Sequence, residues 1–242
     1  MREIFTRIED NAPITIEVAT EIDVVQKEYP WLVSVFIKYA KPKEDEENYT
    51  FLELKESLII ALELEKKAVF VGMRVVDGWS ELYFYAREPK AHEATVAKLL
   101  KEMHYPYESN AVKDAKWDFY EMQLFPSDLE FCHIQSAKII FLLQEEGDTL
   151  LEPREVEFYA VFDTPTQKER FVAHAIDAGF TYKDDLSTEE YDHGVAMTRV
   201  QSVSEEAMAP SVESFFEMVQ KERGHYEGWS TVFLGDASDE EE

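Results

Sequence analysis

Few residues could perform catalysis, and the strongest pair is Cys132 and His133, a potential nucleophile beside a potential base. The surrounding residues predict a helix, in which consecutive side chains point about 100 degrees apart. At that angle a cysteine and a histidine cannot form the hydrogen bond that activates the thiol. We therefore interpret Cys132 as a core thiol beside a helix histidine, and we expect the chain to have no catalytic residues.

Metal and phosphate sites also lack their usual residue patterns. Cys132 is the only cysteine, which excludes an internal disulfide and a cysteine-based zinc cluster. The 8 glycines form neither a Gly-x-Gly-x-x-Gly nor a Gly-Lys-Ser/Thr loop. No histidine pair has the i, i+4 spacing with an intervening glutamate that binds zinc. The other histidines stand singly, at His92, His104, His174, His193 and His225. We expect no metal and no cofactor.

An acidic loop is the one alternative metal site. It contains Asp184, Asp185, Glu189, Glu190 and Asp192, whose carboxylates are the hard oxygen ligands that calcium prefers. The loop lacks the one-residue acidic spacing and the central glycine of a calcium-binding loop. We interpret it as a solvated loop.

The charge balance limits the kinds of partner. The chain has 24 basic and 51 acidic residues, a formal net charge of -27. So negative a protein repels nucleic-acid phosphates and anionic lipids, which disfavours direct nucleic-acid binding and membrane binding. It favours a protein partner with a basic surface, whose association weakens in salt. The alternative is that the charge serves only solubility.

The sequence predicts a cytoplasmic protein. Residues 1–10 include charged residues and no apolar core, so we expect no signal peptide. No apolar run approaches the roughly 20 residues of a membrane span.

The first half predicts two short strands within residues 1–30, followed by the order strand, helix, strand, strand, helix, strand. Asp77-Gly78 supplies the tight turn of a hairpin. Glu88-Pro89 opens the second helix, since proline is tolerated at the first helical position. In chain order the elements are a strand at 31–39, a helix from Phe51, strands at 68–76 and 79–85, a helix from Glu88, and a strand at 115–125. This order is the ferredoxin-like plan.

Three aromatic residues alternate along the strand at 79–85. Trp79, Tyr83 and Tyr85 therefore share a face, and readers of single-stranded RNA stack bases on aromatics of this kind. The matching basic residues are sparse. We expect this face to pack either on the second domain or on the first strands.

The second half repeats the plan after an additional helix, which begins at a Ser127/Glu130 capping box and runs to about Glu146. Thr164-Pro165 caps the next helix, and Gly179 suits its left-handed end. Gly224 is expected to end the last helix. Strands are expected at 155–162, from 180 to 183, at 193–203 and at 225–233. The fold class is thus α+β, with two tandem ferredoxin-like βαββαβ sandwiches, each an antiparallel sheet with helices on one face. We expect domains at 1–130 and 131–235 and a disordered acidic tail at 236–242.

The last predicted strand contains the most specific motif, Tyr226-Glu227-Gly228-Trp229. We expect Trp229 to anchor this strand and Gly228 to permit a close backbone approach or a bulge. The function would then lie in the residues that this anchored strand presents to a partner, namely Glu227 and the acidic tail. The candidate partner-binding residues are Tyr226, Glu227, Trp229, Asp236, Asp239, Glu240, Glu241 and Glu242.

Residues 135–242 resemble the family of regulator of ribonuclease activity B, an inhibitor of ribonuclease E. The shared features are the charged lead-in at 153–157, the helix ending Ala178-Gly179-Phe180, and Tyr226-Glu227-Gly228-Trp229 followed by an acidic tail. Roughly residues 1–130 resemble domain-of-unknown-function family 695. The features that match there are Tyr29-Pro30-Trp31-Leu32 and Leu82-Tyr83-Phe84-Tyr85.

The resemblance implies a ferredoxin-like regulator that binds and inhibits a ribonuclease E-like enzyme without catalysis of its own. Two alternatives remain open. One is an enzyme of undescribed type with a site in a cleft between the domains, and the other is a general acidic protein-interaction module.

Overall fold

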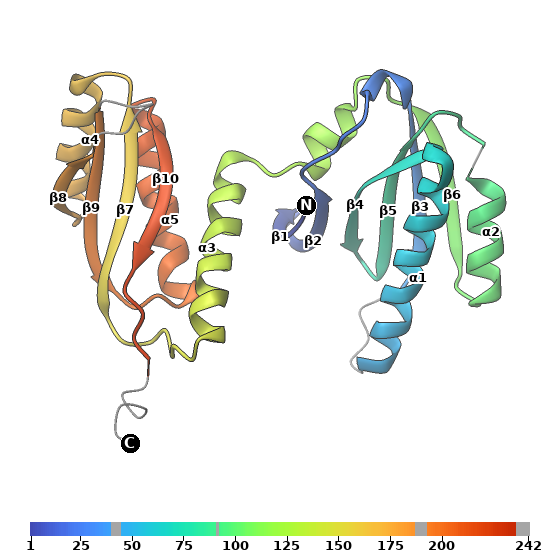
Figure 1. Ribbon diagram of the computed structural model, residues 1–242, viewed down its shortest axis with the longest axis horizontal. Helices are drawn as coiled ribbons and strands as arrows, with labels where there is room; N and C mark the ends of the chain where they lie inside the picture. The colour runs from blue at the N-terminus through green and yellow to red at the C-terminus, as the bar shows by residue number, and fades with distance from the viewer. Residues whose placement is uncertain (40–44, 91, 187–192, 236–242) are drawn as a thin grey trace. The chain divides into compact units, whose positions relative to one another are not determined.

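The computed structural model describes residues 1–39, 45–90, 92–186 and 193–235, and it divides the chain into two compact units. The first unit is Met1–Phe125 and the second begins at Pro126 (Figure 1). Each unit contains the predicted order of strand, helix, strand, strand, helix, strand, which confirms the α+β fold class.

The first unit contains, within the described residues, a six-stranded antiparallel sheet with the order β1-β2-β4-β5-β3-β6. Its last four strands have the ferredoxin-like arrangement, and the β1-β2 hairpin extends the sheet beyond β4. The elements are β1 (Arg2–Glu9), β2 (Ala12–Ala19), η1 (Gln26–Glu28), β3 (Trp31–Lys38), α1 (Asp45–Glu63), η2 (Leu64–Lys66), β4 (Ala68–Val76), β5 (Trp79–Ala86), α2 (Glu93–Glu102), β6 (Tyr107–Lys113) and η3 (Tyr120–Leu124).

Turn-forming residues determine part of the backbone path in the first unit. Asp77 and Gly78 have φ angles of 48° and 79°, as expected of a tight β4-β5 turn, so this prediction is confirmed. The α1 helix begins at Asp45, earlier than the predicted Phe51. The predicted start of α2 at Glu88-Pro89 is wrong, because the helix begins at Glu93. Pro89 instead lies in a turn, where its fixed φ is equally favourable.

Both faces of the first sheet are covered. Helices α1 and α2 lie over one face of the sheet (Figure 1). Val33, Val35 and Phe84 belong to one core cluster with apolar residues of both helices. On the other face Tyr83 and Tyr85 pack against the segment that contains Trp117 and η3. The rings of Tyr85 and Trp117 stack with their centroids 4.0 Å apart. Tyr83 and Tyr85 are therefore core and offer no open platform for RNA bases, whereas Trp79, the third aromatic residue on this face, is half-buried.

The predicted strand at 115–125 is wrong. The closing strand is β6, at Tyr107–Lys113, and residues 120–124 form a π-helical turn. Asp114 favours that turn, since its carboxylate accepts hydrogen bonds from the backbone N–H groups of Asp118 and Phe119 at 3.0 and 2.9 Å. The aromatic residues that suggested a strand instead cover the second face of the sheet.

The second unit has a four-stranded antiparallel sheet in the order β10-β7-β9-β8. An additional helix, α3, precedes the sheet and packs against α5 and β10. The elements are α3 (Asp128–Glu145), β7 (Arg154–Phe162), α4 (Pro165–Asp177), β8 (Thr181–Leu186), β9 (His193–Gln201), α5 (Glu205–Lys221) and β10 (His225–Thr231). The predicted capping box of Ser127 and Glu130 and the left-handed Gly179 (φ 87°) are confirmed.

The two faces of the second sheet differ. Inner side chains such as Phe158 and Phe162 join Phe171 of α4 and Phe215 of α5 in one aromatic core. On the outer face, Lys183 Nζ lies 2.7 Å from Glu155 Oε1 and 2.8 Å from Glu157 Oε1. Charged pairs thus occupy the face opposite to the one that α4 and α5 cover.

Helix α5 ends at Lys221, three residues before Gly224, in agreement with the predicted end of the helix. Arg223 has a left-handed backbone (φ 59°), and the Gly224 N–H donates to the Val219 carbonyl oxygen at 3.0 Å. Gly224 is also required for space, because a Cβ atom there would lie 2.4 Å from the Phe162 ring and 2.8 Å from the Val161 carbonyl oxygen. The glycine therefore allows the chain to pass close to β7 as it enters β10.

Substituting these two neighbours separates the two roles. We expect Gly224→Ala to lower the free energy of unfolding by about 3 kcal/mol, since the added methyl group overpacks a closed site. Arg223→Gly should change it by less than about 1 kcal/mol, because glycine adopts positive φ without strain. Urea unfolding of both variants measures the difference, and equal losses would contradict the close-approach role of Gly224.

Candidate functional site

Trp229 ties the last strand to α3. Its side chain is 5% exposed, and its indole Nε1 donates a hydrogen bond to Ser136 Oγ at 3.0 Å. Ser136 is itself buried in α3. The predicted anchoring of this strand by Trp229 is confirmed, and the pairing explains why a serine lies on the apolar side of the helix.

A bulge in β10 sets the direction of its side chains. Tyr226 pairs with Ala160 and Gly228 pairs with Tyr159, which leaves Glu227 as the extra residue. Gly228 has φ 110°, a backbone angle that favours glycine. In a regular strand, residues three apart point to opposite faces. Here the bulge brings Tyr226 and Trp229 to the same groove.

The groove lies among α3, α5 and β10 and has a volume of about 480 Å³. Its apolar lining includes Phe131, Ile139, Phe216 and Trp229. Among the described residues, the carboxylates that line it are those of Asp128 and Glu227, both exposed, and no lysine or arginine is in the lining. We call this feature the α3-β10 groove.

The Tyr226 hydroxyl lies in the wall of the groove without a hydrogen-bond partner among the described residues. Burial, together with the nearby Cys132, raises the pKa of this hydroxyl above its ordinary value. The ring centroid lies 5.5 Å from that of Phe215. An unpaired buried hydroxyl is costly, whereas the ring itself packs well.

Replacing Tyr226 with phenylalanine tests that cost. We expect Tyr226→Phe to raise the free energy of unfolding by about 1 kcal/mol, because it removes an unpaired polar atom and keeps the ring. Chemical denaturation provides the measurement. A loss of stability instead would show that the hydroxyl has a partner, such as an ordered water molecule.

Cys132 also lines the groove, but its chemistry is that of a core residue. Burial, with a smaller effect of the Asp128 charge, raises the pKa of the Cys132 thiol to about 11. The thiol is therefore protonated at neutral pH, and a protonated thiol is a poor nucleophile. This agrees with the interpretation of Cys132 as a core thiol.

A buried ion pair holds the end of β10 in place. Arg154 donates two hydrogen bonds to Asp148, one of them at 2.8 Å, and the two side chains are 3% and 0% exposed. Arg154 Nη1 also donates to the Val232 carbonyl oxygen, and Asp148 accepts from the backbone N–H of Leu234. The pair thus fixes the chain just after the groove-lining strand.

The same contacts shift the titration of Asp148. The hydrogen bond from Arg154 lowers the pKa of Asp148 well below its usual range, against the effect of burial and with help from the N–H groups of Leu234 and Leu150. A carboxyl with a lower pKa in the folded state stabilises the fold most above its unfolded-state pKa of about 3.9. That stabilisation is lost as the pH falls towards the folded-state pKa.

We expect Asp148→Ala to lower the free energy of unfolding by about 3 to 5 kcal/mol at neutral pH, because it leaves Arg154 buried without its partner. The difference from the wild type should shrink as the pH falls below about 4. Denaturant unfolding across pH is the measurement. Asp163→Ala serves as the control, since Asp163 is exposed in the same unit. A pH-independent difference would contradict the assigned role of the carboxylate.

Three of the predicted partner-binding residues lie in the described part of the chain, and the other five do not. Glu227 is exposed, Tyr226 is half-buried, and Trp229 is buried. Asp236, Asp239, Glu240, Glu241 and Glu242 lie outside the described residues, and so do Glu189, Glu190 and Asp192 of the acidic loop. The structure brings Tyr226, Glu227 and Trp229 together in the α3-β10 groove.

Sequence reasoning missed the partners that these residues meet across the groove. Phe131 and Ile139 belong to α3 and Phe216 to α5, and none was singled out. Their signal in the sequence was weak, since α3 carries apolar residues on more than one side. Such a helix indicates a second packed or accessible face without saying what lies opposite.

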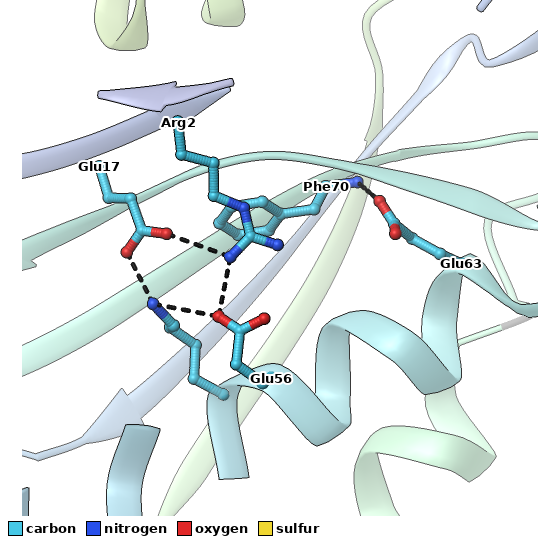
Figure 2. Close-up of polar contacts among 6 residues, drawn as sticks. Arg2, Glu17, Glu56, Glu63 and Phe70 are labelled. Atoms are coloured by element: carbon cyan, nitrogen blue, oxygen red, sulfur yellow. Dashed lines mark hydrogen bonds and ion pairs between the residues drawn. The ribbon is translucent and has the colours of Figure 1, made fainter. Parts of the chain in front are cut away.

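The first unit contains a cluster of charged side chains, shown in Figure 2. Buried Lys55 Nζ lies 2.7 Å from Glu17 Oε2 and 3.4 Å from Glu56 Oε1. Arg2 Nη1 lies 2.7 Å from Glu56 and 3.4 Å from Glu17. The Arg2 guanidinium also covers the Phe70 ring, with 4.8 Å between its carbon and the ring centroid.

This cluster balances two cations with two carboxylates. Burial alone would raise the pKa of Glu56, yet the hydrogen bonds and charges of Arg2 and Lys55 lower it. The four residues come from β1, β2 and α1, so the cluster joins the N-terminal hairpin to the helix. Paired charges of this kind are best explained as a structural clamp.

The part of the chain that the structure describes contains no candidate metal-binding cluster and no candidate membrane-spanning helix. Within those residues no group of three or more histidine, cysteine, aspartate or glutamate side chains could hold a metal ion. No described helix is both long enough and apolar enough to cross a membrane.

Two family models match the chain. Residues 4–125 match the model described as Family of unknown function (DUF695), and residues 133–231 match the one described as Regulator of ribonuclease activity B. The second match supports a general role in regulating ribonuclease activity. None of the curated proteins matches. A crystal structure of an unknown protein from Galdieria sulphuraria is 10% identical, with 84% of this chain and 98% of that chain covered and a TM-score of 0.24.

Proposed function

Because the chain belongs to the family of unknown function DUF695 and its second unit matches Regulator of ribonuclease activity B, we propose that it is a non-catalytic regulator. It binds and inhibits a ribonuclease E-like endoribonuclease and so modulates RNA turnover. The observation that carries the proposal is the extent of the second match, residues 133–231. That match runs from α3 to the end of β10 and so includes most of the α3-β10 groove.

Charge and side-chain chemistry also support a binding role. The net charge of -27 favours binding to a partner with a basic surface and disfavours direct binding of this chain to RNA phosphates. The raised pKa of Cys132 and the paired charges around Lys55 leave neither group ready for catalysis. The regulator would thus act by occupying the ribonuclease, in the cytoplasm, where that enzyme meets its RNA.

An inhibition assay with the full chain tests the proposal. A purified ribonuclease E-like enzyme cleaves a fluorescent RNA while the concentration of the chain is increased. We expect saturable inhibition that weakens as salt is raised, because opposite charges steer the association. An unrelated protein of similar negative charge is the control for non-specific effects of polyanions.

Two results would contradict the proposal. One is unchanged cleavage at low salt together with no binding heat in calorimetry. The other is RNA cleavage by the chain alone, which would identify an enzyme instead of a regulator.

A further inference from the structure

The α3-β10 groove has an apolar lining that the second unit leaves partly uncovered. Phe131, Ile139 and Phe216 are all half-buried, while Trp229 beneath them is fully packed. A volume of about 480 Å³ lies within the range of ligand-binding pockets. Such a groove has room for a few apolar side chains of a partner, but not for a folded domain.

The bulge at Glu227 directs both Tyr226 and Trp229 to the groove, and the space beside Gly228 is open. Gly228 carries no side chain, and a Cβ atom at that position would meet no other atom within 4 Å. The hydrogen bond from Trp229 Nε1 to Ser136 Oγ holds the Trp229 ring in place, which keeps the ring from moving into the groove. The groove is therefore formed before a partner binds, which lowers the free-energy cost of ordering its side chains on binding.

The charges along the groove select the kind of partner. Asp128 and Glu227 are exposed on its lining, which contains no lysine or arginine from the part of the chain that the structure describes. A basic segment gains from both carboxylates, whereas a second copy of this chain, with a net charge of -27, is repelled. The same repulsion disfavours an acidic peptide.

We propose that the α3-β10 groove binds a segment of a partner protein whose one or two apolar side chains insert between α3 and β10. Lysine or arginine residues beside them pair with Asp128 and Glu227. The identity of the partner rests on the proposed function, which makes the segment part of the ribonuclease. The location and the chemistry of the site rest on the groove alone.

Binding of a designed peptide to the full chain tests the site without the ribonuclease. The probe is a fluorescent amphipathic peptide of leucine and lysine, measured by anisotropy. One comparison peptide keeps the lysines and replaces leucine with serine, and the other keeps the leucines and replaces lysine with glutamate. We expect binding of the first peptide and at least a tenfold weaker affinity for the other two, because apolar anchors and complementary charge are both needed.

Variants locate the binding to the groove. Glu227→Lys should weaken binding about fivefold through repulsion, and Gln220→Trp should weaken it about tenfold by filling the opening. Gln220 is exposed in α5, so its replacement keeps the core intact. Glu169→Lys is the matched control, because Glu169 is exposed in α4, outside the groove, and its substitution makes the same change in charge. Circular dichroism verifies the fold of each variant.

The outcomes are distinguishable. Equal weakening by Glu169→Lys and Glu227→Lys would overturn the proposal, because binding would then follow net charge alone. Unchanged binding in Gln220→Trp would also overturn it. In the ribonuclease assay, inhibition that survives both groove variants would refute the docking site while the proposed function stands. Peptide binding in the groove without any effect on the ribonuclease would refute the proposed function while the site stands.

Discussion

An antiparallel sheet with helices on one face leaves a second face that must be either buried or made polar. The two units satisfy this constraint in different ways. The first unit buries its second face. Trp117 stacks on Tyr85 and donates its indole N–H to the Tyr29 carbonyl oxygen at 3.0 Å, while Tyr120 reaches the Ala19 carbonyl oxygen at 2.7 Å. The second unit makes that face polar, with Lys183 between Glu155 and Glu157.

This difference decides where each unit has surface available for a partner. Tyr83 and Tyr85 of β5 are buried in the core of the first unit, so they offer no stacking platform. In the second unit the outer face of the sheet is charged, and the apolar opening lies instead between α3 and β10. The additional helix thus creates the groove, since the four-stranded sandwich without α3 would lack one of its walls.

Local chemistry could be predicted from the sequence, whereas contacts between distant segments could not. Ser127 with Glu130, Asp77 with Gly78, and Gly179 each act through neighbours in the chain, and their roles follow from backbone geometry. The aromatic run at 115–125 looked like a strand because β-propensity reflects packing on a half-buried surface. These residues do pack on the sheet, but they cover its second face and do not form one of its strands. Trp229 was predicted to be an anchor, yet its partner Ser136 is 93 residues away in the chain, and no local pattern connects them.

The edges of the second sheet have a consequence for how the protein associates. β8 is an edge strand whose residues Thr181 to Asp185 are exposed and include Lys183, Asp184 and Asp185. Charged side chains on an edge strand discourage the strand-to-strand pairing that leads to aggregation. The opposite edge, β10, has α3 packed against it. In the second sheet, charged side chains therefore lie along the edge strand β8, while α3 packs against the edge strand β10.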